Sequence, residues 1–207
     1  MSQNLHPGLN LGASHGDAHQ QSELSVFGFW VFLMSDLITF GVLFATYAAS
    51  STPIAMAGGP GPAALFDLTS TGMQTAFLLA SSLTCGMASL ALKYREGPRR
   101  IALWLAVTAL LGAGFLALEL RDFADMIAKG ATPMRSGWLS SLYALVGLHG
   151  LHITAGLVWI VVLLLLIWRR GVTDLIKTRL LIFALYWHFL DLVWIGIFSV
   201  VFLRGLA

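Results

Sequence analysis

The 207-residue sequence has a single cysteine and few charged residues. Cys85 alone excludes an intrachain disulfide and any Cys-x-x-Cys site, and its apolar surroundings predict a buried, inert thiol. Charged residues make up 11% of the chain, against about 25% in a soluble domain. A net charge of +2 without a basic face argues against nucleic-acid binding. The remainder is 57% hydrophobic with a mean hydropathy of +0.81, which is typical of a protein that crosses a membrane several times.

Several motifs that carry chemistry are also missing from the sequence. It contains no nucleophile motif, no Gly-rich phosphate loop, no His-Glu-x-x-His motif and no histidine-rich box of the membrane di-iron type. No internal repeat is apparent, which argues against an inverted-repeat transporter. The residues alone therefore predict no catalytic centre.

Five apolar runs, each at least 18 residues long, follow a polar segment. A helix needs about 20 residues to cross about 30 Å of hydrocarbon, and a spanning segment must satisfy its own backbone groups. The runs do not alternate in polarity, so they do not predict a β-barrel. We therefore expect an all-α integral membrane bundle, with a polar, disordered tail over residues 1–25 and a membrane domain over residues 26–207. The expected helices span about 27–49, 72–92, 101–120, 138–168 and 180–203.

Basic residues in the loops predict the orientation. The second and fourth loops hold eight of the twelve Lys and Arg residues, and such loops face the cytoplasm. This places the N-terminus inside and the C-terminus outside. The first loop, residues 51–67, is rich in Pro and Gly and predicts an irregular external connection. The basic residues concerned are Lys93, Arg95, Arg99, Arg100, Arg169, Arg170, Lys177 and Arg179.

Small residues spaced four apart occur in the second and third apolar runs. Such spacing lets helices approach closely and predicts a tight bundle. The residues concerned are Ser81, Cys85 and Ser89, then Thr108 and Gly112, and Ala113 and Ala117.

Six ionisable residues lie within or at the ends of the apolar runs, and such residues indicate a functional site by default. They are Asp36, Glu119, His149, His152, His188 and Asp191. Residues three apart share a helix face, so His149 with His152, and His188 with Asp191, are expected to point into the bundle together. Glu119 is a candidate partner of the histidine pair. Asp36 and His188 lie about 14 and 12 Å from the cytoplasmic side, so they could share one level.

The polar set has three interpretations. A metal or haem site needs three or four ligands at one point, and no complete ligand motif is present. A proton path through Asp36, Glu119 or the histidines is the second. Structural hydrogen bonds between helices, with some lipid contact, are the interpretation that the residues favour, because a carboxylate beside an imidazole reduces the cost of burying both.

Four stretches carry a resemblance to a known family. The motifs HGLHITAGLVW (residues 149–159) and YWHFLDLVW (186–194), with FGFWVFLMSDLITFGVLFATYA (27–48) and GAGFLALEL (112–120), resemble subunit III of the haem–copper terminal oxidases. The resemblance covers residues 27–204. The five helices look like the form that lacks the first two of seven, which is similar to subunit III of bacterial cytochrome bo3 ubiquinol oxidases. Asp36 occupies the place of a reactive glutamate in the cytochrome c oxidase branch and is one methylene shorter.

The resemblance implies an accessory subunit in a bacterial inner membrane, with a periplasmic C-terminus. It would hold no haem or metal and no catalytic residue, while haem b, haem o and CuB would lie in subunit I. The expected partners are subunit I in direct contact, subunits II and IV, and phospholipids. The complex would oxidise ubiquinol, reduce oxygen to water and pump protons. A cytochrome c-type oxidase subunit III and a stand-alone proton channel or transporter remain as alternatives.

Overall fold

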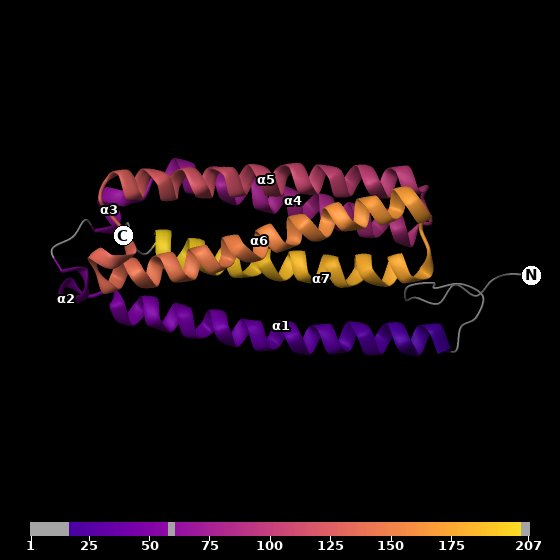
Figure 1. The fold of residues 1–207 in the computed structure, drawn as a ribbon, viewed down its shortest axis with the longest axis horizontal. Coiled ribbons are helices and arrows are strands. Elements are labelled where there is room, and N and C mark those ends of the chain that lie inside the picture. Colours follow the sequence, from indigo (N-terminus) through magenta and orange to yellow (C-terminus); the bar gives the residue numbers. More distant parts are fainter. Residues whose placement is uncertain (1–16, 58–60, 204–207) are drawn as a thin grey trace, which may run out of the picture.

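The computed structural model describes residues 17–57 and 61–203, and it contains the five expected spans as helices (Figure 1). These are α1 (Asp17–Ser50), α4 (Leu68–Lys93), α5 (Pro98–Ala128), α6 (Gly137–Arg170) and α7 (Asp174–Ile197), which continues into a π-helical segment η2 (Phe198–Leu203). Each span is long and apolar enough to cross a membrane. The prediction of an all-α bundle with five spans is confirmed.

The predicted helix ends are less accurate than the spans. The third helix is predicted to end near residue 120, but α5 continues to Ala128 and includes Arg121, Asp122 and Asp125. The apolar run ends at the first charged residues, but the helix itself continues, because a helix can extend into the aqueous layer. Likewise, α7 begins at Asp174 rather than at residue 180. Helix α1 begins at Asp17, so the end of the segment predicted as a tail is helical, and residues 1–16 lie outside the described part.

The first loop contains two single-turn helices, so its prediction as irregular is wrong for these residues. They are α2 (Pro53–Met56) and α3 (Pro62–Leu65), and each begins at a proline. Proline fits a first helical turn because its missing N–H would have no partner there. The hydroxyl of Thr52 accepts a hydrogen bond from the backbone N–H of Ala55 and caps α2. A 3-10 turn, η1 (Pro133–Arg135), precedes α6.

The helices form a bundle in which α7 is central and α1 is peripheral. Helix α4 packs most extensively on α5, while α7 packs on α1, α4 and α6 (Figure 1). In the most apolar part of each span, 61% of α7 is buried inside the bundle, compared with 11% of α1. Of the five described spans, α1 is therefore the one that the other helices cover least.

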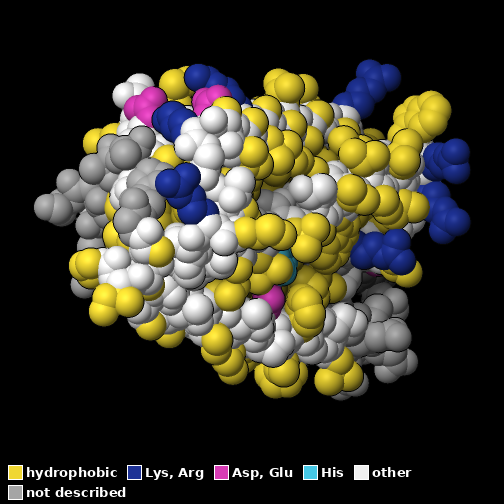
Figure 2. Space-filling view, turned by 60° about the vertical axis from the view of Figure 1, so that its left-hand side comes forward, with side chains coloured by type: hydrophobic (Ala, Val, Ile, Leu, Met, Phe, Trp, Pro, Cys, Tyr) yellow, Lys and Arg dark blue, Asp and Glu magenta, His cyan; other side chains and the backbone are white. Residues whose placement is uncertain are grey.

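The start of α1 lies at the same end of the bundle as the α4–α5 and α6–α7 connections (Figure 1). The α5–α6 connection and the end of η2 lie at the opposite end. Figure 2 shows Lys and Arg side chains near both ends of the molecule, with a broad hydrophobic surface between them. This distribution fits a membrane band bounded by two aqueous layers.

The small residues of the second and third spans lie in different surroundings. Thr84 on α4 and Thr108 on α5 form a hydrogen bond of 2.8 Å between their hydroxyls, which ties these two helices together. Gly112 lies directly beneath the indole ring of Trp187 on α7. In contrast, Ala113 and Ala117 are exposed, so their spacing marks no contact inside this chain.

Candidate functional site

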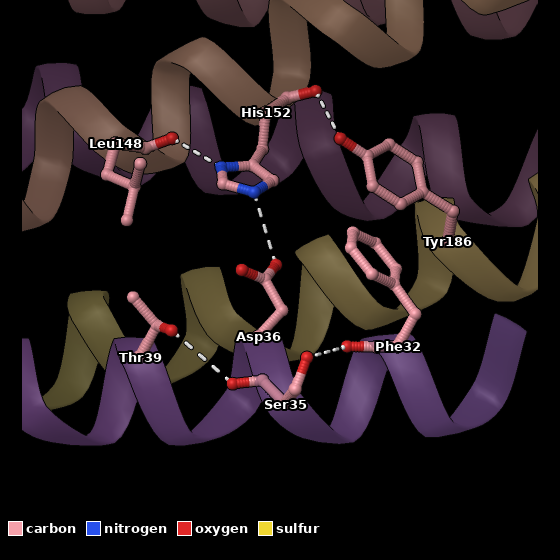
Figure 3. Close-up of polar contacts among 7 residues, drawn as sticks. All are labelled: Phe32, Ser35, Asp36, Thr39, Leu148, His152 and Tyr186. Atoms are coloured by element: carbon pink, nitrogen blue, oxygen red, sulfur yellow. Dashed lines mark hydrogen bonds and ion pairs between the residues drawn. The ribbon is translucent and has the colours of Figure 1, made fainter.

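The Asp36 carboxylate and the His152 imidazole join α1 to α6 in the interior of the membrane-spanning region (Figure 3). Oδ2 of Asp36 lies 3.1 Å from Nε2 of His152, and both side chains are mostly buried, at 13% and 18% exposed. Nδ1 of His152 lies 2.7 Å from the backbone carbonyl oxygen of Leu148. A carbonyl oxygen only accepts, so Nδ1 carries a hydrogen. The imidazole therefore lies between the backbone of its own helix and the Asp36 carboxylate of α1.

Residues from three helices surround this pair. The Tyr186 hydroxyl on α7 donates a 2.8 Å hydrogen bond to the backbone carbonyl of His152, and Phe40 on α1 packs 5.4 Å from the imidazole, centroid to centroid. On α1 itself, Ser35 donates to the carbonyl of Phe32, and Thr39 donates to the carbonyl of Ser35 (Figure 3). The hydroxyls beside Asp36 are thus satisfied within their own helix, and the carboxylate is the group that reaches across to α6.

Asp36 therefore contacts His152 rather than His188, with which it was expected to share a level. Among the described residues, Glu119, the candidate partner of the histidine pair, forms no hydrogen bond with His152. Three residues along a helix correspond to a rotation of about 300°, so two such side chains diverge by about 60°. This divergence lets His149 and His152 face different neighbours.

Glu119 on α5 and His149 on α6 form a second buried group. Glu119 is 3% exposed and His149 is 0% exposed. The Glu119 carboxylate packs against Gly150, where an added Cβ would lie 2.9 Å from Oε1. Within the described residues, neither oxygen of Glu119 and neither ring nitrogen of His149 has a hydrogen-bond partner. The expected hydrogen bond between Glu119 and the histidine pair is therefore absent, although the carboxylate lies beside the backbone next to His149.

Aromatic rings enclose His149. Its ring stacks on Trp194 at 5.4 Å and meets the edge of Phe115 at 5.8 Å. Phe115 is one turn from Glu119 along α5, so the carboxylate and the imidazole lie in the same buried part of the bundle. Such a site is costly for a charge and retains polar groups only when they have a role in packing or proton chemistry.

The third polar group lies between α4 and α7. Ser82 Oγ is 2.7 Å from Nδ1 of His188, which is exposed on the outside of α7. Asp191 is 9% exposed, and among the described residues its Oδ1 has no hydrogen-bond partner. The prediction that both residues point into the bundle is correct for Asp191 and wrong for His188, again because the two positions diverge around the helix.

The sequence did not single out Trp187, which joins four helices. Its indole Nε1–H donates a 3.0 Å hydrogen bond to Ser81 on α4. Its ring lies over Gly112 of α5 and Gly156 of α6, where added Cβ atoms would come within 2.9 and 2.7 Å of ring carbons. The small residue at each of these positions is the signal that could have indicated the contact.

A cavity of about 330 Å³ opens at the end of the bundle formed by α3, the start of α4 and the end of α5. Asp122 lies on its wall and accepts hydrogen bonds from the Ser70 hydroxyl (2.8 Å) and the Gln74 amide (2.6 Å). Glu119 also lines the cavity. Among the described residues, no group of three or more His, Cys, Asp or Glu side chains is arranged to hold a metal ion.

Five apolar spans linked by buried polar contacts define a multi-pass membrane protein. The family model described as cytochrome c oxidase subunit III matches residues 10–206, so the chain belongs to this family.

Curated relatives agree with this family and cover nearly the whole chain. A cytochrome bo(3) ubiquinol oxidase subunit 3 of Pseudomonas putida is 48% identical over 90% of this chain and 89% of its own length. A protein of the same name from Pseudomonas aeruginosa is 44% identical over 99% and 97%. A cytochrome c oxidase subunit 3 of Bacillus sp. PS3 is 39% identical over 87% and 86%.

Proposed function

We propose that this chain is subunit III of a proton-translocating ubiquinol oxidase in a bacterial inner membrane. The observation that carries the proposal is the 44% identity to a cytochrome bo(3) ubiquinol oxidase subunit 3 over 99% of the chain. In this role the chain is an accessory subunit without a catalytic or redox centre. Ubiquinol oxidation, oxygen reduction and proton pumping take place in the complex, and haem b, haem o and CuB belong to subunit I.

In this function the six intramembrane polar residues stabilise the subunit rather than react. The contact between Asp36 and His152 supports this role, because it links α1, the most peripheral helix, to α6. Glu119, His149, His188 and Asp191 set helix packing and the electrostatic surroundings of subunit I, or contact lipid. The direct partner is subunit I, and subunits II and IV complete the complex.

The orientation belongs to the same proposal. The N-terminus and the connections at residues 94–97 and 171–173 face the cytoplasm, and the end of η2 faces the periplasm. The basic residues that flank these two connections support this assignment.

Affinity purification of the full chain from native membranes tests the proposal. We expect partner subunits to co-purify, with a haem spectrum and ubiquinol oxidase activity in the complex and no stoichiometric Soret band in the isolated chain. A Soret band of the isolated chain would contradict an accessory subunit. Proton flux through liposomes that contain the chain alone would instead support a channel.

A cytochrome c-type oxidase is the second candidate, because one relative with 39% identity carries that name. The two candidates differ in the electron donor of the purified complex. Oxygen consumption with reduced cytochrome c but not with ubiquinol would favour the second. For either donor, Asp36→Asn or His188→Ala is expected to reduce assembly or turnover stability more than initial oxygen consumption. Loss of initial turnover in a fully assembled variant would contradict a structural role.

A further inference from the structure

His188 presents an imidazole on the outer surface of the bundle at the middle of a membrane span. Helix α7 begins at Asp174 and its span ends at Leu203, so His188 lies halfway along these 30 residues. At 1.5 Å per residue, the ring is about 20 Å from either end of the span. A histidine side chain is too short to reach an aqueous layer from that depth. Its exposed part therefore lies at the level of lipid tails.

Only one ring nitrogen of His188 has a partner among the described residues. Nδ1 lies 2.7 Å from the Ser82 hydroxyl of α4, and no described group forms a hydrogen bond with Nε2. In a neutral ring, Nε2 is a donor or an acceptor, depending on the tautomer. Lipid tails neither donate nor accept hydrogen bonds, so they leave such a group unsatisfied at high cost. Nε2 therefore requires a polar group from outside this chain.

Asp191 adds a second ionisable group to this part of the surface. It lies one turn further along α7, beside Ser82 and His188. Its side chain is 9% exposed, and among the described residues its Oδ1 has no hydrogen-bond partner. The three side chains form a polar cluster across α4 and α7 that reaches the outer surface at His188. Ionisable groups at such a depth are placed there for a function by default.

The exposed side of α7 lies between two neighbouring helices. The bond from His188 to Ser82 joins one flank of α7 to α4. On the other flank, the ring of Phe44 on α1 reaches Gly196, where an added Cβ would lie 3.1 Å from a ring carbon. The side between these flanks has no helix of this chain over it, and His188 is exposed there.

The surface around His188 has the features of a helix-packing face. Leu192 and Ile195 continue the exposed side of α7 at helical spacing, at 63% and 46% exposed. On α4, Leu83 is 70% exposed, and Gly86 has no atom within 4 Å of a Cβ. A glycine with open space beside it lets another helix approach closely.

We propose that a transmembrane helix of another oxidase subunit packs on this surface and places a hydroxyl or carboxamide side chain against Nε2 of His188. The inference rests on the proposed function, which provides membrane-embedded partner subunits. Hydroxyl and carboxamide groups both donate and accept, so they fit either tautomer of the ring. They are also neutral, so their burial costs less than that of a charge.

Photo-crosslinking in native membranes tests the surface. A benzoylphenylalanine replaces Leu192 or Leu83 in the full chain, and the complex is purified after irradiation. We expect both positions to form an adduct with the same partner subunit, and the cross-linked peptide to map to the middle of a transmembrane helix with a hydroxyl or carboxamide side chain. The control position is Leu110, which is 73% exposed on α5 and should not cross-link to that helix.

Adducts with lipid alone, or with a second and differently tagged copy of this chain, would overturn the proposal. Purification separates this inference from the proposed function. Partner subunits that co-purify without a cross-link to this surface contradict the inference alone. A chain that purifies without any partner subunit contradicts the proposed function.

Two substitutions test the hydrogen bond of His188. Asn can keep the contact with Ser82 but does not extend to the position of Nε2, whereas Gln reaches further. In a detergent titration of the complex, we expect His188→Asn to lower the retention of this chain about ten-fold, the effect of one hydrogen bond. His188→Gln should keep most of the retention. Wild-type retention of His188→Asn, or equal losses in both variants, would contradict the hydrogen bond.

The partner side chain found by cross-linking completes the test. Its replacement by Leu should cause no further loss of retention in the His188→Asn variant, because the same contact is already gone. Additive losses would overturn the assigned contact. The cross-linking experiment keeps His188 in place, so it decides the proposal even if a variant fails to assemble.

Discussion

Asp36 Oδ2 lies 3.1 Å from His152 Nε2, and this contact links α1 to α6 within the hydrocarbon layer. Helix α1 has the smallest buried share of the five described spans, and Leu33, Phe40 and Tyr47 are its buried apolar residues. Lipid tails also compete with apolar side chains for the same surface, which makes polar contacts between membrane helices specific. We therefore expect the pair to contribute to the position and rotation of α1, together with its apolar contacts on α6 and α7.

Replacing one member of this pair should loosen α1. Asp36→Ala or His152→Ala leaves a mostly buried partner without its contact, and we expect each to cost about 2 kcal/mol of stability. The unfolding midpoint of the purified complex measures the loss, and proteolysis between α1 and α4 measures the detachment of α1.

The double variant separates this contact from general damage. If the two residues act through each other, Asp36→Ala with His152→Ala should lose clearly less than the sum of the single variants. Asp174→Asn is the matched control, because this carboxylate forms an exposed contact with Lys177, and such pairs contribute about 0–1 kcal/mol. Additive single losses would show that no coupling exists.

Gly156 should not tolerate a methyl group. An added Cβ would lie 2.7 Å from a ring carbon of Trp187, whose ring is also confined by Gly112. Because the indole ring cannot move away from both helices, we expect Gly156→Ala to destabilise the bundle by about 1–3 kcal/mol. Thermal unfolding followed by tryptophan fluorescence measures this change.

Gly147 provides the control on the same helix. No atom lies within 4 Å of a Cβ at this position, so Gly147→Ala should be neutral or slightly stabilising. Equal destabilisation by both alanines would show that helix flexibility, and not the contact with Trp187, explains the requirement for glycine at position 156.

Ser81 should matter through the indole of Trp187. The Ser81 hydroxyl accepts the hydrogen bond from Nε1, and both residues are buried. Ser81→Ala leaves this N–H without an acceptor, which costs about 1–3 kcal/mol. The unfolding midpoint of the complex measures the change, and Ser35→Ala, an exposed serine on α1, should have no effect. If Trp187→Phe removes most of the effect of Ser81→Ala, the hydrogen bond is its cause.

Length and composition were sufficient to predict the five spans. A run of about 20 apolar residues has few alternatives to a spanning helix, so this part of the fold needs no tertiary information. The extent of α5 was not predictable in the same way, since Arg121 and Asp122 are charged and give no apolar signal.

The pairing of the polar residues could not be predicted for a different reason. Spacing along one helix indicates which residues share a face, but the partner depends on which helix packs there. Helix α1 packs on α6, and this arrangement brings Asp36 to His152 although 116 positions separate them in the sequence. The hydrogen bond from the Tyr186 hydroxyl to the His152 carbonyl was also not predictable, because every residue has a backbone carbonyl and the sequence does not indicate which one accepts.

The orientation in the membrane is testable with two single cysteines. Met134 in η1 is fully exposed and Tyr94 at the end of α4 is 71% exposed, and they lie at opposite ends of the bundle. With the basic connections in the cytoplasm, a membrane-impermeant maleimide should label Met134→Cys in right-side-out vesicles and Tyr94→Cys only after permeabilisation. The parent chain is the control, because Cys85 is 1% exposed and should remain unlabelled in both conditions. The reverse labelling pattern would place the α4–α5 connection and the start of α1 outside.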